Sequence, residues 1–239
     1  MPSLLSPLFE REEALLREVA DACEEALESR SLSESLPAQV QAYARHVRSL
    51  LDGLAGEIHD HLAADIEESV AAAGEPSARE TESRSQQSPG ETETRFPISQ
   101  NAAAFLRTVR ADFPGLTEKH PELLRLLMDS QPFLDANSWL ALTDKLASSE
   151  EPLALSPRTS GNLLRLSMMT YHGEEISFSL DRQPDAKQRS ATGLSGHSQA
   201  WTGVDLEASG TDVLVSLLSI HDGVGALWTA LSAKLEKSE

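Results

Sequence analysis

The chain has 239 residues, of which 38 are acidic and 20 are basic, so its formal net charge is −18. A hydrophobic content of 40% is enough to bury a core, which excludes a wholly disordered chain. The acidity disfavours DNA or RNA as a partner, because phosphates need cationic side chains. The single cysteine, Cys23, excludes an internal disulfide framework and a cysteine-based zinc site.

The sequence is expected to contain neither a secretory signal nor a transmembrane helix. The start, MPSLLSPLFEREE, has no basic residue before the apolar stretch and soon turns acidic, unlike a secretory signal. No uninterrupted apolar run approaches the roughly 20 residues that a membrane span needs. We therefore expect a cytoplasmic protein with no membrane partner.

The first third of the chain predicts an acidic helical hairpin over residues 1–72. Helices are expected at 7–29, begun by Ser6 as the cap, and at 37–72. The longer one carries apolar residues at steps of three and four, which makes one apolar face. This third holds 15 acidic and 5 basic residues, so it presents either a solvated face or a docking surface for a basic partner. The early glutamates Glu10, Glu12 and Glu13 suit a helix N-terminus.

The longer helix is expected to extend beyond the shorter one. At 1.5 Å per residue their lengths are about 50 Å and about 35 Å, which leaves Leu62, Ile66 and Val70 without a partner on the first helix. Uncovered apolar side chains often mark an interface. We expect these three to contact the rest of the chain, a second copy or another protein, and we favour self-association or a helical protein partner.

Residues 73–97 predict a flexible linker and a domain boundary. No aliphatic residue larger than alanine occurs between Val70 and Phe96, and Gly, Pro, Ser, Glu and Gln dominate. Such a stretch cannot offset its ordering entropy by burial. The chain is thus expected to divide into the hairpin, the linker and a second unit over 98–239.

The second unit is expected to be α+β and the whole protein mainly helical. Start signals at Ser99, Pro121 and Asn137 precede three apolar-striped segments. Period-two alternation then predicts a β-hairpin around a turn at 172–174, a third strand at 201–206 follows a loop at 182–200, and a final helix runs from a cap at Ser209 or Thr211 to about 236. Two glycines, Gly223 and Gly225, are expected to weaken that last helix.

The histidines and the cysteine do not make an evident site in the sequence. His59 and His61 point to different sides of a helix, whereas His61 and Asp65 are four apart and could share an ion. Two ligands fall short of the three that catalytic zinc usually takes from protein, so we expect no metal site and no cofactor. The expected roles of the others are ordinary: His120 a turn residue, His221 a buried and satisfied imidazole, and Cys23 an unreactive thiol beside Glu24 and Glu25.

Residues 121–165 resemble a group of HEPN-like bacterial proteins of poorly defined function. The resemblance is carried by Pro121-Glu-Leu-Leu, Ser130-Gln-Pro-Phe133, Asn137-Ser-Trp-Leu140 and Leu155-Ser-Pro-Arg-Thr159. The chain departs at 147–152, which holds none of the Asn, Lys and His that this group has there. The resemblance implies a HEPN-like α+β unit, and the polar cluster of that group is missing at that point.

The HEPN resemblance also draws attention to Arg165 and His172. In HEPN ribonucleases an Arg and a His a few residues apart on a helix stabilise charge and move a proton at the scissile phosphate. Here the pair falls on a strand-like pattern and a turn, so we do not expect it to be catalytic.

These observations favour a non-catalytic interaction or regulatory protein, within a bacterial defence or stress system. The partner is expected to be a protein or a second copy, bound through the N-terminal helices. Two alternatives stay open: a metal-independent HEPN-type ribonuclease, and an antitoxin-like protein that neutralises a basic partner.

Overall fold

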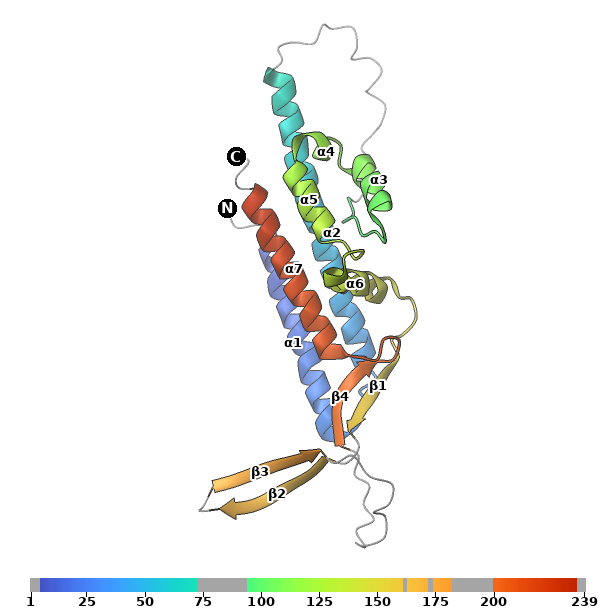
Figure 1. The fold of residues 1–239 in the computed structure, drawn as a ribbon, viewed down its shortest axis with the longest axis vertical. Helices are drawn as coiled ribbons and strands as arrows, with labels where there is room; N and C mark the ends of the chain where they lie inside the picture. Colours follow the sequence, from blue (N-terminus) through green and yellow to red (C-terminus); the bar gives the residue numbers. More distant parts are fainter. Residues whose placement is uncertain (1–4, 73–93, 161–162, 172–173, 182–199, 236–239) are drawn as a thin grey trace.

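A computed structural model of the chain describes residues 5–72, 94–160, 163–171, 174–181 and 200–235. Three long helices run along one another: α1 (Ser6–Ser29), α2 (Leu36–Ala72) and α7 (Val213–Leu235) (Figure 1). The shorter helices between them in sequence are α3 (Ala102–Asp112), α4 (Leu116–Lys119), α5 (Pro121–Asp129), the 3₁₀ turn η2 (Asp135–Asn137) and α6 (Ser138–Ser148). The predicted helices are confirmed, and α4 and η2 are additional.

The strands form two small antiparallel sheets. The first has the order β1 (Leu155–Ser160), β4 (Ala200–Leu206) and β5 (Thr211–Asp212), and the second pairs β2 (Leu163–Tyr171) with β3 (Glu174–Asp181). The predicted hairpin and third strand are confirmed, with Leu164 opposite Leu180 and Leu166 opposite Phe178. Strand β1 was not predicted, because its segment, LSPRTS, lacks an apolar alternation. The protein is therefore mainly helical and α+β, as expected.

Arg158 and Asp212 join the three-stranded sheet to α7. The Arg158 guanidinium pairs with Asp205 and, at 2.6 Å, with Asp212 Oδ2. The other oxygen of Asp212 accepts the backbone N–H of Val215 at 3.1 Å, so Asp212 caps α7. The prediction that Ser209 or Thr211 caps this helix was wrong, since the nearer carboxylate reaches the free amide.

Two other predicted caps are also corrected. Ser6 lies inside α1, whose N-cap is Leu5, and no side chain caps that end. At α3 the cap is Asn101, whose side chain accepts from Ala104 N at 2.9 Å. Ser99 is instead buried, with its backbone N–H bound to Gln131.

One hydrophobic core runs through the helices on both sides of the predicted linker. Val19 on α1, Tyr43 on α2, Phe105 on α3, Leu140 on α6 and Leu217 on α7 are all fully buried in it. In the described residues the N-terminal hairpin and the C-terminal unit therefore share their core rather than each enclosing one.

The end of the predicted linker is packed against α2. Residues 73–93 lie outside the described part of the chain, whereas Phe96 and Pro97 are buried. The N–H of Phe96 donates to Asp52 Oδ1 at 2.8 Å, and its carbonyl accepts from Arg48 at 3.1 Å. These bonds fix the point at which the chain rejoins the helices.

The apolar end of α2 is partly covered by the rest of the chain. Leu62 is only 3% exposed and belongs to the core. It is therefore not a free docking position within this fold. The side chains of Ile66 and Val70 lie outside the described ones, so an interface through them stays a prediction.

Helix α7 is long and apolar enough, by length and composition, to cross a membrane. The expectation of no such segment considered only uninterrupted apolar runs, and α7 is interrupted by residues such as Ser216 and His221. Six apolar residues of α7 are buried against the other helices: Val213, Leu217, Ile220, Val224, Leu227 and Leu231. That arrangement is equally typical of the core helix of a globular protein.

A buried glutamine fastens the segment before α3 to the end of α5. Gln131 is 0% exposed; its Oε1 accepts from Ser99 N at 3.0 Å and its Nε2 donates to the carbonyls of Pro97 at 2.8 Å and Leu127 at 3.0 Å. The sequence indicated only that Gln131-Pro132-Phe133 ends a helix. The amide binds the Ser99 N–H and the Pro97 carbonyl, and it shares the Leu127 carbonyl with the Ser130 hydroxyl, which donates to it at 2.8 Å.

Replacing Gln131 by methionine is expected to lower the free energy of unfolding by about 2–4 kcal/mol. The volume is nearly kept, but buried backbone groups lose their partners, each at a cost of about 1–3 kcal/mol. Urea denaturation followed by circular dichroism measures the change. The same substitution at Gln100, which is exposed, should stay within about 0.5 kcal/mol. Equal effects at both positions would contradict this role for Gln131.

Candidate metal centre

Two residues of α2 and one from the α4–α5 junction converge at a single point. His61 and Asp65 are four residues apart on α2 and so lie on the same side of the helix. His120 lies between α4, which ends at Lys119, and α5, whose first residue is Pro121. Because proline disfavours the helical conformation in the residue before it, the chain bends here and His120 can face α2.

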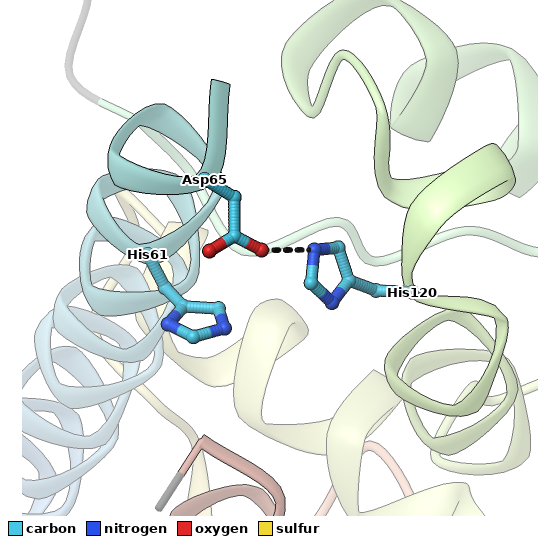
Figure 2. Close-up of side chains that lie close together, drawn as sticks. All are labelled: His61, Asp65 and His120. Atoms are coloured by element: carbon cyan, nitrogen blue, oxygen red, sulfur yellow. Dashed lines mark ion pairs between the residues drawn. The ribbon is translucent and has the colours of Figure 1, made fainter. Parts of the chain in front are cut away.

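The three side chains offer ligand atoms at close range. Nε2 of His120 lies 2.8 Å from Asp65 Oδ2, and the centroids of the two imidazole rings are 5.4 Å apart at an angle of 63°. One ligand atom from each of the three residues can be chosen so that all lie within 4.8 Å of one another. Figure 2 shows Asp65 and His120 pointing toward each other across the gap, with the ring of His61 beside them on α2.

Two imidazole nitrogens of this cluster are buried without a hydrogen bond. Nε2 of His61 and Nε2 of His120 have no hydrogen-bond partner among the described residues. For His120 the Asp65 oxygen is near, but the contact lacks the alignment of a hydrogen bond, so the two atoms form an ion-pair contact only. Buried polar atoms are nearly always satisfied. A cation between the three groups would satisfy both nitrogens.

The donor set suits a divalent transition metal. Imidazole nitrogen and carboxylate oxygen are ligands for zinc and for iron, and three protein ligands leave a coordination position open to water or a substrate. The side chains of His120 and Asp65 are 13% and 32% exposed, so the centre is shielded but reachable from solvent. The single carboxylate and the net charge of −18 both favour a cation.

The sequence predicts two of these residues but not the third. His61 and Asp65 lie on one helix face, but the sequence shows no third ligand, and the expectation of no metal site followed from that. The expected role of His120 was that of a turn residue, which it has, and the turn is what brings it to α2. The prediction that His59 lies apart is consistent with the structure, where it contacts exposed Asp60 at 3.8 Å.

A second polar cluster lies inside the helical core. Glu12 is 0% exposed; it accepts a short hydrogen bond from the Tyr43 hydroxyl, and its other oxygen lies 2.9 Å from His221 Nδ1. Burial, and then the bond to Glu12, raise the pKa of Tyr43 well above its ordinary value, so the hydroxyl stays a donor. His221 is satisfied as expected, although its side chain is 35% exposed. Glu12 was expected at a solvated helix start, and that interpretation was wrong.

The cysteine is a packing residue. Cys23 is buried on α1, and its burial, followed by the charge of Asp212, raises the thiol pKa to about 11. The low reactivity was expected from the neighbouring Glu24 and Glu25. The main cause is instead removal from water, which disfavours the thiolate.

The two ribonuclease candidates, Arg165 and His172, do not form a site among the described side chains. Arg165 lies on strand β2, in agreement with the strand-like pattern, but its side chain is outside the described ones. His172 also lies outside the described residues. The ribonuclease interpretation therefore stays a prediction.

Comparison with known proteins gives no relative. No family model, curated protein or solved structure matches the chain. The resemblance of residues 121–165 to HEPN-like proteins stays a prediction, and the function has to be argued from the residues themselves.

Proposed function

We propose that this protein binds a divalent transition-metal ion through His61, Asp65 and His120. The observation that carries the proposal is the convergence of these side chains with two buried imidazole nitrogens that lack hydrogen bonds. The ion would be coordinated by both imidazole nitrogens and the carboxylate at once. A cluster held together only by a charged histidine and Asp65 would leave the His61 nitrogen unsatisfied.

The position of the site suggests what the ion would do for the fold. It lies between the C-terminal half of α2 and the short α4–α5 connection. Lys119, next to His120, also reaches α2, with Nζ 3.5 Å from the carbonyl of Asp65. A bound ion would fasten the α4–α5 segment to α2, so metal binding would add to the stability of the folded state.

Zinc titration of the chelator-treated, full-length protein tests the proposal. We expect one Zn²⁺ per chain by isothermal titration calorimetry and a rise in melting temperature. An ion at a hundred times its Kd should stabilise the protein by about 2.7 kcal/mol. Replacing His120 by alanine should abolish both effects, and Co²⁺ in place of Zn²⁺ should give visible absorption bands that the variant lacks.

His59→Ala is the matched control. It removes from the same helix a histidine whose side chain is 45% exposed and which belongs to no cluster of three metal-ligating side chains among the described residues. The His59→Ala variant should bind Zn²⁺ with the same affinity and stoichiometry as the unmodified protein. Binding lost equally in both variants, or kept in both, would refute the assignment of the site.

A second candidate function is non-catalytic interaction or regulation through a protein partner. It is favoured by the exposed apolar side chains of Val215 and Leu218 on one groove, described below, and by the net charge of −18. The charge suits the antitoxin-like alternative, in which a basic partner is covered. The HEPN-type ribonuclease alternative has no such support.

A further inference from the structure

An open groove of about 720 Å³ lies between α5, the start of α6 and the outer face of α7. Leu126 and Asp129 come from α5, Trp139 from α6, and Val215, Leu218 and Asp222 from α7. The groove is separate from the metal centre, whose residues do not line it.

Two of the three large apolar side chains that the fold leaves exposed line this groove. In the described residues they are Leu134, Val215 and Leu218, with exposed fractions of 40%, 65% and 49%. Val215 and Leu218 line the groove, whereas Leu134 is not among its lining residues. Single exposed apolar residues are ordinary, but a group around one hollow marks a binding surface.

The shape of the groove suits a helix. Small residues of α7 line it along its length: Ser219, Ala226 and Ala230. They allow another backbone to approach closely. From Val215 to Ala230, at 1.5 Å per residue, the lining extends for about 22 Å, which is the length of about four helical turns.

The acidic residues of the groove favour a positively charged binding partner. The lining contains the two exposed carboxylates Asp129 and Asp222 and, among the described residues, no lysine or arginine. Arg125 lies 3.7 Å from Asp129, outside the lining, and offsets part of that charge. A second copy of this chain would bring another net charge of −18 to the same place, which disfavours self-association.

We propose that the groove binds an amphipathic helix of a basic protein partner. About four turns would place an apolar face on Val215, Leu218 and Leu126, with lysines or arginines of its flank near Asp129 and Asp222. This gives the interaction proposal a surface and a partner chemistry, and it does not depend on the metal centre.

A synthetic peptide can test this on the full-length protein. The probe is a fluorescein-labelled 18-residue helix made of leucine and lysine with the leucines on one face, and the comparison peptide has glutamate in place of lysine. At about 0.15 M salt we expect saturable 1:1 binding of the lysine peptide by fluorescence anisotropy, and at least tenfold weaker binding of the glutamate peptide. A lysine peptide that does not bind would overturn the proposal.

Variants locate the binding. Val215→Gln combined with Leu218→Gln keeps the charge and alters exposed residues only, and Asp222→Lys reverses one rim charge. Each should weaken binding about tenfold, with far-ultraviolet circular dichroism confirming the fold. Asp112→Lys on α3, also exposed, makes the same change in net charge away from the groove and should change affinity less than threefold. If Asp112→Lys lowers the affinity for the lysine peptide as much as Asp222→Lys does, the peptide is attracted by net charge alone. That result would refute the groove as the binding site. It would not refute the proposal that the protein binds a protein partner.

Two other occupants would overturn the proposal. If sedimentation shows a dimer that the double glutamine variant dissociates, the occupant is a second copy. If vesicles of phosphatidylcholine and phosphatidylglycerol bind the protein and the double variant abolishes that binding, the surface is a membrane contact of α7.

Discussion

Replacing Glu12 by alanine is expected to lower the free energy of unfolding by about 3–5 kcal/mol, which is a large part of the stability of an ordinary domain. Glu12 is 0% exposed and joins α1 to α2 and α7 through Tyr43 and His221. Without its carboxyl group the Tyr43 hydroxyl keeps only the longer contact to the carbonyl of Leu217 at 3.3 Å. His221 loses its partner, and a cavity is left where three helices meet.

Urea denaturation followed by circular dichroism measures this effect, and Glu13→Ala is the matched control. Glu13 is the next residue of α1 and is exposed, so its replacement should change stability by no more than about 0.5 kcal/mol. A double-mutant cycle with Tyr43→Phe should give a coupling energy of about 1–3 kcal/mol, because the two side chains share a buried bond. Independent effects of the two substitutions would contradict the cluster.

Alanine at Gly223 is expected to destabilise the protein by about 1–2 kcal/mol, whereas alanine at Gly225 is expected to stabilise it by up to about 1 kcal/mol. A Cβ at position 223 would lie 2.4 Å from two ring carbons of Trp139, and one at position 225 would meet nothing within 4 Å. Trp139 is 7% exposed and cannot move without disturbing its neighbours. Both glycines were expected to weaken α7, but at Gly223 the absence of a side chain is what lets α6 approach.

The two glycine variants can be compared directly by thermal and urea unfolding. Their opposite signs distinguish a clash from helix propensity, which would favour alanine at both positions. Replacing Trp139 by leucine first should remove the penalty of Gly223→Ala, because the ring is then absent. A penalty that persists in the leucine background would show that another contact limits position 223.

Local patterns predicted the elements of this protein because the forces behind them are local. Apolar steps of three and four along residues 37–72 matched α2, and alternation around Leu164 and Ile176 matched the β2–β3 hairpin. A helix or a hairpin needs only its own backbone bonds and one face to bury, and both are visible in a short window of sequence. Strand β1 has no such alternation and is formed by its pairing with β4.

The capping residues and the buried polar side chains could not be predicted from local sequence patterns. Ser6, Ser99 and Thr211 have the chemistry of caps, yet the bonds went to other residues or were not made. The burial of Glu12 depends on α7, which begins about two hundred residues later in the chain. The charge of Glu12 and its position near a helix start therefore predicted a solvated side chain, which was wrong.

The sequence alone determined the fold class, the helical hairpin, the acidic character and the pairing of His61 with Asp65 on one helix face. Only the tertiary structure decided that His120 joins that pair, that Glu12 is buried with His221, and that the helices on both sides of residues 73–93 share one core. The physical reason is that a site of three side chains depends on how helices pack, and packing is set by the whole apolar surface to be buried rather than by any one segment. In this protein the helices can be read from periodicity, whereas the sites lie where helices far apart in the sequence meet.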